Sequence, residues 1–212
     1  MVFPHPLAAG KEGLLAIGGD LSSTRLLMAY HFGIFPWYQE GEDILWWSPD
    51  PRCVLYPKDL IIHKSMRSVL RKKPYQVTFN REFAQVIKHC KETTRAGQHG
   101  TWITSYMVDA YIKLHHLGYA HSVEVWSGKD LVGGLYGILL GNMFFGESMF
   151  SLLPNTSKYG FIHFVQQLEN KGCWLIDCQQ DTPHLRSLGA SLISREQFQQ
   201  VLRKNLLVLL ED

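Results

Sequence analysis

The sequence lacks the features that mark secreted, membrane-spanning and metal-binding proteins. Its four cysteines include no Cys-X-X-Cys pair, so neither a disulfide framework nor a zinc site of that kind is expected. Its ten histidines are scattered without the spacing of metal ligands. No apolar run reaches the ~18 residues that suggest a membrane span, and the N-terminus has no basic stretch followed by an apolar core. We therefore expect a cytoplasmic protein with reduced thiols, no membrane contact and no bound metal.

The sequence also lacks a large excess of either positive or negative charge. The 21 lysines and arginines nearly balance 19 aspartates and glutamates, which leaves a formal charge of +2. Contact with a nucleic acid would therefore depend on a local basic patch. The sequence has neither a GxGxxG motif after a strand nor a GxxxxGK[ST] motif, so dinucleotide and ATP sites are not expected. No serine or cysteine lies in a nucleophile motif, which disfavours a covalent intermediate.

What the sequence does have is a hydrophobic content of 46% over 212 residues, enough for one large core or two unequal domains. An early segment is rich in aromatic residues and contains Pro36, Pro49 and Pro51, which disfavour a long helix or a central strand. The pattern changes near Arg52. We therefore expect a small N-terminal domain at residues 1–53 and a larger domain at residues 54–212.

Helical and strand-like patterns are mixed along the chain. Helices are predicted at 24–32 after Ser22, at 64–72, after Asn80, between Ile103 and Gly118, after Asn155, after Pro183, and after the Ser194–Gln197 capping box. Strands are predicted at 75–79, 121–126, 131–140, 143–150 and 173–179. Glu124, in the second of these strands, is expected to face solvent or to have a structural role. The pattern predicts an α+β (or α/β) fold with a mostly antiparallel sheet flanked by helices.

Two carboxylates, Glu147 and Asp177, lie in the most apolar, strand-like parts of the chain. Acidic side chains in such surroundings are usually paired or used in chemistry. Asp177 and Gln179 are two residues apart on a predicted strand and so share one face, where they could hold an ammonium group or accept a proton. Structural roles remain open for both carboxylates. Asp177 could help to cap the next helix, and Glu147 could pair with Arg52 or Lys158.

Two further groups of side chains are candidates for contact with RNA. The tryptophans at 37, 46, 47 and 102 could stack on bases or simply join the two domains, and the second role is favoured for Trp46 and Trp47. Basic residues gather on and just after the predicted helix 64–72, namely Lys64, Arg67, Arg71, Lys72 and Lys73. This cluster could contact phosphates or form a solvated face.

A series of short motifs runs through the chain from Phe3 to Leu202. In its first part it includes GLLAIGGDL at 13–21, GIFPW at 33–37 and LWWSPDPR at 45–52. Farther on it includes TWI at 101–103, HSVE at 121–124, FGESMFS at 145–151, LIDCQ at 175–179 and SLGA at 187–190. By these motifs the chain closely resembles the bacterial leucyl/phenylalanyl-tRNA–protein transferases.

The resemblance implies a cytoplasmic, monomeric aminoacyltransferase. Such an enzyme moves Leu, Phe or Met from its charged tRNA to a protein whose N-terminus is Arg or Lys, and so creates an N-degron. The implied fold is a small N-terminal domain plus a larger domain like the GCN5-related N-acetyltransferases. No cofactor is expected, because the aminoacyl ester of the tRNA is already activated. A CoA-dependent N-acyltransferase and a non-catalytic tRNA-binding protein are the competing hypotheses.

The resemblance also gives roles to individual residues. Asp177 matches the catalytic carboxylate with Gln179 beside it, and Glu147 would hold the cationic end of the acceptor. Trp37 and Trp102 would contact the terminal adenosine of the tRNA. The pocket for the transferred side chain would be lined by Leu135, Phe144, Met149, Phe161, Phe164 and Ile176. The tRNA phosphates would be contacted by Lys64, Arg67, Arg71, Lys72 and Lys73.

The acceptor amine has to be neutral before it can attack the ester. An α-amine has a pKa of ~7.7–8.0, so much of it is protonated at neutral pH. The hypothesis at this stage is that Asp177, with Gln179, orients the amine and accepts or relays its proton.

Overall fold

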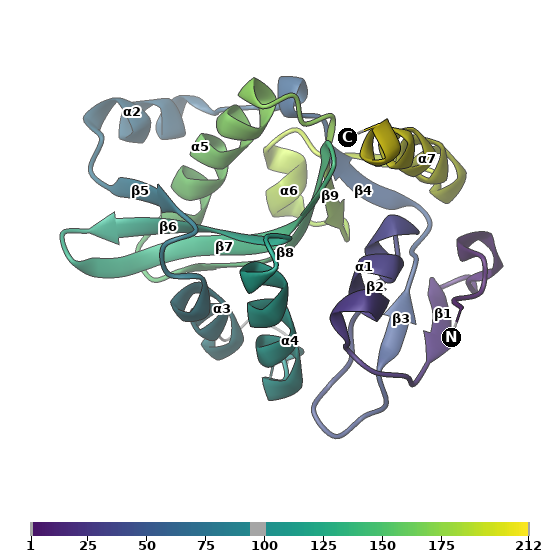
Figure 1. The fold of residues 1–212 in the computed structure, drawn as a ribbon. Helices are drawn as coiled ribbons and strands as arrows, with labels where there is room; N and C mark the ends of the chain where they lie inside the picture. Colours follow the sequence, from purple (N-terminus) through teal and green to yellow (C-terminus); the bar gives the residue numbers. More distant parts are fainter. Residues whose placement is uncertain (1, 94–100, 212) are drawn as a thin grey trace.

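The computed structural model describes residues 2–93 and 101–211 and is built on a seven-stranded sheet (Figure 1). In sheet order the strands are β10 (Ser191–Ile193), β4 (Arg52–Leu55), β9 (Leu175–Gln179), β8 (Met143–Ser151), β7 (Asp130–Leu140), β6 (Ala120–Ser127) and β5 (Gln76–Phe79). Neighbouring strands are antiparallel except for β8 and β9, which are parallel. The expected mixed α/β fold with a mostly antiparallel sheet is confirmed.

Helices cover both faces of this sheet. On one face lie α3 (Phe83–Glu92) and α4 (Ser105–His116), and on the other lie α5 (Thr156–Asn170), α6 (Pro183–Ser187) and α2 (Lys64–Lys72), with the 3-10 turn η2 (Pro57–Asp59) packed against α5 (Figure 1). Strand β7 is therefore buried along nearly its whole length. That burial explains why its sequence is a nearly continuous apolar run rather than an alternating one.

The chain before β4 forms a second, three-stranded sheet in the order β1 (Leu14–Ile17), β3 (Leu45–Trp47) and β2 (Phe35–Pro36). The 3-10 turn η1 (Pro6–Ala8) precedes it, and helix α1 (Ser23–His31) lies between β1 and β2 in the chain. Trp46 is buried in one core cluster with side chains of α1, α4 and β7, and its indole N–H donates to the carbonyl oxygen of Gly18 at 2.9 Å. The structural role expected for Trp46 is confirmed.

Helix α7 (Arg195–Glu211) packs back onto this N-terminal part. The side-chain amide of Gln199 donates to the carbonyl oxygen of Phe32 at 2.8 Å. Gly33 has a positive φ of 69°, and a Cβ atom there would lie 2.6 Å from the ring of Phe198. Glycine is therefore needed both for the backbone turn after α1 and for the close approach of α7.

Local sequence signals located most of the helix boundaries. The helix predicted at 64–72 coincides with α2, and Ser22 and the Ser194–Gln197 box cap α1 and α7 as expected. The cap predicted at Asn80 is wrong. Asn80 has a positive φ of 58°, and its side-chain oxygen accepts from the backbone N–H of Ser122 at 2.9 Å. Its side chain therefore joins β5 to β6 instead of starting α3.

Glu124 is completely buried, so the expectation that it faces solvent is wrong and the structural alternative is right. Its two carboxylate oxygens accept hydrogen bonds from the hydroxyls of Thr78 and Ser122, each at 2.6 Å. Strand β6 lies between β5 and β7. Because this carboxylate is buried, it is satisfied by hydroxyls of β5 and of β6 itself rather than by water.

Two irregularities open the sheet between β8 and β9. These strands pair only as far as Phe145 and Asp177. In the β7–β8 pair, Tyr136 and Gly137 face Ser148 and Gly146, so Glu147 is the extra residue of a bulge. A second bulge, in the β4–β9 pair, leaves Cys178 as the extra residue between Asp177 and Gln179. Because a bulge bends its strand and redirects a side chain, the strand segments after Phe145 and Asp177 can border a cavity.

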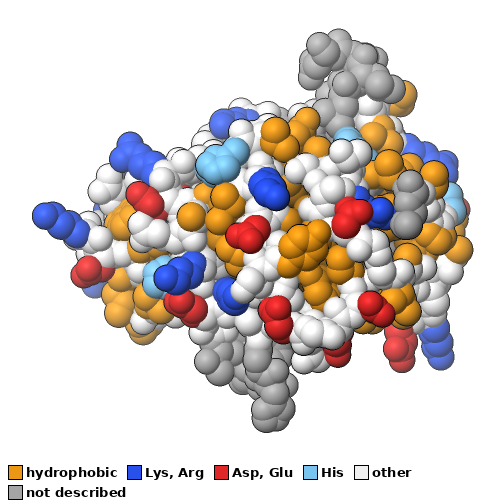
Figure 2. All heavy atoms as spheres, turned by 60° about the horizontal axis from the view of Figure 1, so that its bottom comes forward, with side chains coloured by type: hydrophobic (Ala, Val, Ile, Leu, Met, Phe, Trp, Pro, Cys, Tyr) orange, Lys and Arg blue, Asp and Glu red, His pale blue; other side chains and the backbone are white. Residues whose placement is uncertain are grey.

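Basic side chains are distributed differently on two sides of the molecule. Figure 2 shows the lower side of the view in Figure 1, where acidic and basic side chains are interspersed with apolar ones. The basic helix α2 lies on the upper side in Figure 1. Of the helices in the described part of the chain, none has the length and apolar character needed to cross a membrane.

Candidate active site

A cavity of about 310 Å³ lies where β8 and β9 diverge. Its polar lining includes Glu147 from β8 and both Asp177 and Gln179 from β9. The N-terminal part contributes Phe35 and Trp37 to the same wall. The three polar residues singled out from the sequence are therefore brought together, at a place that both sheets help to shape.

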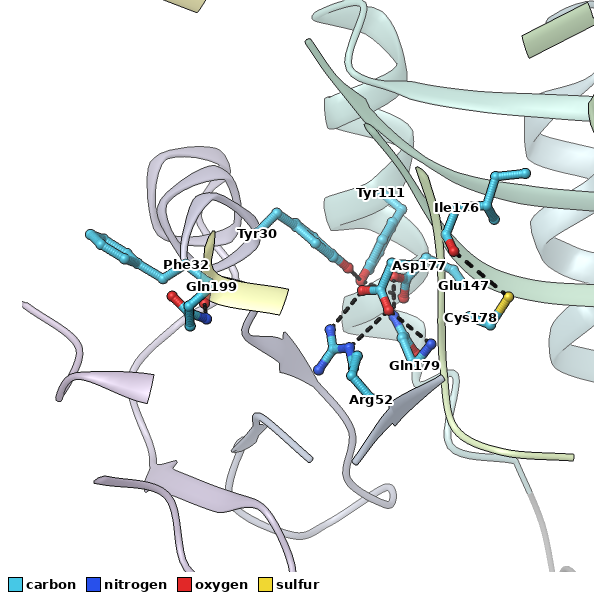
Figure 3. A network of polar contacts seen from close by, with 10 residues as sticks. All are labelled: Tyr30, Phe32, Arg52, Tyr111, Glu147, Ile176, Asp177, Cys178, Gln179 and Gln199. Carbon is cyan, nitrogen blue, oxygen red and sulfur yellow. Dashed lines mark hydrogen bonds and ion pairs between the residues drawn. The ribbon is translucent and has the colours of Figure 1, made fainter. Parts of the chain in front are cut away.

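Asp177 is completely buried and forms an ion pair with Arg52 of β4 (Figure 3). Nε of Arg52 donates to Oδ1 of Asp177 at 2.8 Å, and Nη2 donates to Oδ2 at 2.6 Å. The guanidinium carbon lies 4.8 Å from the ring centroid of Phe35 and 4.7 Å from that of Phe198. The two rings hold the guanidinium in the plane from which both carboxylate oxygens can be reached, and the forked contact compensates the buried charge.

Glu147 is also buried, but its carboxylate is held by neutral groups (Figure 3). The hydroxyl of Tyr111 donates to Oε2 at 3.0 Å, and the side-chain amide of Gln179 donates to Oε1 at 2.8 Å. The hydroxyl of Tyr30 is hydrogen-bonded to that of Tyr111. Burial raises the pKa of Glu147 to about 7, although the tyrosine hydroxyls oppose the shift. The ion pair with Arg52 or Lys158 considered from the sequence is therefore wrong.

Gln179 connects the two carboxylates. Its backbone N–H donates to Oδ1 of Asp177 at 2.9 Å, while its side chain reaches Glu147. Gln179 has a positive φ of 61°, which ends β9 and turns the residue toward the cavity. Asp177 does not cap α6, because the hydroxyl of Thr182 accepts the hydrogen bond from the backbone N–H of Leu185 at 3.2 Å. The predicted proximity of Asp177 and Gln179 is confirmed, and the capping alternative for Asp177 is wrong.

Trp37 and Trp102, the two tryptophans expected to contact the terminal adenosine, both line the cavity. Trp37 follows β2 and is held from behind by Trp47, whose indole N–H donates to the carbonyl oxygen of Trp37 at 2.7 Å. The two rings lie edge to face with centroids 5.8 Å apart. Trp102 precedes α4 and is half-buried. Both indoles therefore present apolar surface to the opening.

Most of the predicted side-chain pocket also lies on the cavity wall. The lining residues of this set are Leu135, Phe144, Met149, Phe161 and Ile176. Phe164 does not line the cavity and lies behind Phe144, with ring centroids 4.7 Å apart in an edge-to-face contact. The wall is thus apolar and backed by a second layer of core side chains.

The basic cluster lies outside the cavity, and only the start of α2 is linked to an element that borders it. Lys64, Arg67, Arg71, Lys72 and Lys73 are all exposed on or just after α2. Immediately before α2, the ring of His63 is hydrogen-bonded to the carbonyl oxygen of Ser187 at the end of α6, at 2.7 Å. His184 and Leu185 of α6 line the cavity. An extended ligand could therefore run from α2 across α6 into the opening.

Sequence reasoning did not identify three residues of this network. Arg52 was considered only as a partner of Glu147, and Tyr30 and Tyr111 were not singled out for chemistry. The one available signal was the tyrosines' position on the apolar faces of α1 and α4, because a buried hydroxyl needs a partner. Within the described residues, no group of His, Cys, Asp and Glu is arranged to hold a metal ion.

Comparison with known families identifies the chain. A family model described as leucyl/phenylalanyl-tRNA protein transferase matches residues 54–203, and the model of the N-terminal domain of the same family matches residues 19–50. The chain belongs to the leucyl/phenylalanyl-tRNA–protein transferase family. It is accordingly an enzyme of the transferase class, which agrees with the resemblance found in the sequence motifs.

Curated members of this family match along nearly the whole chain. The protein from Syntrophobacter fumaroxidans is 54% identical, over 97% of this chain and 88% of its own length. The protein from Flavobacterium johnsoniae is 52% identical, over 96% of each chain. Each of these relatives is named leucyl/phenylalanyl-tRNA–protein transferase.

Solved structures with partial similarity include FemX, which has a TM-score of 0.47 at 13% identity and covers 84% of this chain and 70% of its own. A GCN5-related N-acetyltransferase from Kribbella flavida has a TM-score of 0.38 at 10% identity, over 78% of this chain and 58% of its own.

Proposed function

We propose that this member of the family transfers Leu, Phe or Met from charged tRNA to the N-terminal α-amine of proteins that begin with Arg or Lys. The new peptide bond gives the acceptor a destabilising N-terminus, and the enzyme acts as a cytoplasmic monomer with a small N-terminal domain at residues 1–53. The observation that supports this best is the cavity itself, which combines an apolar wall with two carboxylates and two flanking tryptophans.

The donor occupies the apolar side of the cavity in this proposal. A volume of about 310 Å³ is at the small end of ligand pockets, which suits one amino-acid side chain with its ester. Trp37 and Trp102 pack against the terminal adenosine, a contact that is worth ~1–3 kcal/mol per stacked base in single-strand recognition. The exposed cations of α2 hold phosphates of the acceptor stem, because α2 begins beside α6 at the cavity border.

The acceptor enters with its α-amine beside Gln179 and the carboxylates. The carboxylate of Glu147, which has no ion-pair partner in the described part of the chain, favours a cationic N-terminal residue over a neutral one when it is ionised. Asp177 is already bound to Arg52 through both oxygens. Its role is therefore to fix Gln179, through the backbone hydrogen bond, in the orientation that receives the amine.

The reaction needs no activating cofactor. The ester bond of a charged tRNA stores the free energy that forms the peptide bond, and holding amine and ester together supplies much of the acceleration. A CoA-dependent acyltransferase would need a pyrophosphate loop. The nearest candidate, at 186–190, lacks the R/Q-x-x-G-x-G/A spacing, and the backbone N–H groups of residues 188–190 already donate to carbonyl oxygens of α6.

The test is transfer of label from Phe-tRNA to matched peptides. One peptide begins with free Arg, one with Ala and one with acetylated Arg. Label on the free Arg peptide alone supports the proposed reaction and its acceptor rule. Charged tRNA that binds but transfers label to no peptide would instead indicate a non-catalytic tRNA-binding protein, and transfer from acetyl-CoA would indicate the CoA-dependent alternative.

A further inference from the structure

Two carboxylates line the cavity, but only one of them is free to exchange a proton with a substrate. Both oxygens of Asp177 accept hydrogen bonds from the cationic side chain of Arg52, at 2.8 and 2.6 Å. Protonating Asp177 would break this contact and leave a buried guanidinium without its counter-ion. By contrast, Glu147 has no cationic partner in the described part of the chain, and each of its oxygens accepts a hydrogen bond from a neutral donor, Tyr111 or Gln179.

We propose that Glu147 is the proton acceptor of the transfer reaction, and that Tyr111 and Tyr30 are positioning residues for its carboxylate. This inference rests on the function proposed above. It changes the role of Glu147 from an anchor for the acceptor's charge to a group that takes part in the chemical step.

The lone pair of the neutral α-amine forms a C–N bond to the ester carbonyl carbon, and the carbonyl π electrons move to oxygen. The nitrogen, now positively charged, loses a proton to a carboxylate oxygen of Glu147. The tetrahedral intermediate re-forms its carbonyl as the C–O bond to the ribose breaks, and the leaving ribose oxygen takes the proton from Glu147. The carboxylate is thereby restored, and the products are the peptide bond and free tRNA.

The surroundings of Glu147 fit this role. The charged and titratable groups that face it are Tyr30 from α1, Tyr111 from α4 and Asp177 from β9, with Tyr136 from β7 behind Tyr111 and Arg52 from β4 behind Asp177. Burial raises the pKa of Glu147 to about 7, within about one unit of the ~7.7–8.0 of an α-amine. Such a near match lets the proton move in either direction at neutral pH.

The two tyrosines form a donor chain that starts in the N-terminal part of the molecule. Tyr111 donates to Glu147 and therefore accepts from Tyr30. Burial raises the pKa of both hydroxyls well above the usual value for tyrosine, so they stay protonated and remain donors. The chain fixes one carboxylate oxygen, while Gln179 fixes the other.

The first experiment measures kcat and KM for transfer from Phe-tRNA to an Arg-initiated peptide at pH values from 5.5 to 8.5. For the wild type, kcat is expected to rise with pH through a midpoint near 7. Glu147→Gln keeps the shape of the side chain, and we expect it to lower kcat about 100-fold or more and to remove the midpoint near 7, which leaves only the rise that follows the acceptor amine at ~7.7–8.0. An unchanged kcat with a raised KM would overturn the inference and leave Glu147 as an anchor.

A second variant tests the positioning residues and serves if Glu147→Gln does not fold. Tyr111→Phe removes a hydrogen bond that lowers the pKa of Glu147, so the midpoint of the kcat profile is expected to move to higher pH. Tyr159→Phe is the matched control, because Tyr159 of α5 is also buried but its hydroxyl donates to the carbonyl oxygen of Tyr75, just before β5. A lowered kcat with an unmoved midpoint in Tyr111→Phe would overturn the positioning role.

These outcomes are separable from failure of the proposed function. If the wild type transfers no label to any peptide, the transferase proposal fails and this inference fails with it. If the wild type is active and both variants keep its pH profile, the transferase stands and only the role given to Glu147 is lost.

Discussion

Replacing Arg52 with methionine should destabilise the protein strongly, because it removes the guanidinium that pairs with the fully buried carboxylate of Asp177. Methionine keeps a long apolar stem between Phe35 and Phe198, so loss of packing is small. What remains is Asp177 with its charge uncompensated. Removing one partner of a buried ion pair costs about 3–5 kcal/mol, and we expect Arg52→Met to lower the free energy of unfolding by this amount.

The measurement is urea unfolding at pH 7, with two companions. The double variant Arg52→Met/Asp177→Leu removes both charges and is expected to be more stable than Arg52→Met alone, since no charge is then left unpaired. Arg186→Met is the matched control, because the Arg186–Asp181 pair has the same forked geometry at the surface, and the unfolding midpoint should hardly change. The reasoning is refuted if Arg52→Met behaves like Arg186→Met, or if the double variant is the least stable of the set.

Three further predictions concern RNA contact and pH. Charge reversal at Arg67 and Arg71 should weaken tRNA binding and reduce its dependence on salt by about two phosphate contacts, while transfer from a short aminoacyl-adenosine mimic stays near the wild-type rate; equal loss on both substrates would contradict the proposed phosphate contact. Trp37→Ala should raise KM for the same mimic by the equivalent of about 1–3 kcal/mol, and an unchanged KM would exclude stacking by this residue. Finally, burial raises the pKa of Glu147 from 4.5 to about 7, so the folded state binds this proton more tightly than the unfolded state and stability falls as pH rises across that window. The loss amounts to about 3 kcal/mol, and urea unfolding of Glu147→Gln between pH 4.5 and 7 should show a weaker dependence than the wild type.

The sequence predicted the parts of the fold that depend on local patterns. Helix α2 and the capping box of α7 were located because caps and helical periodicity involve residues within one turn. Asn80 shows the limit of such reasoning, since its side chain bonds to Ser122, 42 residues away, rather than to the helix beside it. Glu124 was misplaced for a related reason, because alternation within one strand does not reveal that helices cover both faces of the sheet.

In the candidate site, too, residues could be predicted from their own segment, but their partners far away in the sequence could not. Glu147 and Asp177 were identifiable from sequence because carboxylates are unusual in apolar strands. The partner of Asp177 was not, since Arg52 lies 125 positions away and is brought to it only by the pairing of β4 with β9. Nor could alternation predict the bulge that turns Glu147 into the cavity, because a bulge is an exception to that alternation.

Glu147 and Asp177, the carboxylates of the proposed active site, belong to the large sheet, but their electrostatic state depends on the chain that precedes it. Phe35 lies over the guanidinium that compensates Asp177, and Tyr30 is the first hydroxyl of the donor chain that runs through Tyr111 to Glu147. Movement of α1 away from α4 would remove a donor from Tyr111, and movement of β2 would remove a ring from the guanidinium of Arg52. We therefore expect the segment before β4 to contribute to turnover. A variant that weakens its packing, such as one at Gly33 against Phe198, should reduce turnover even when the large sheet remains folded.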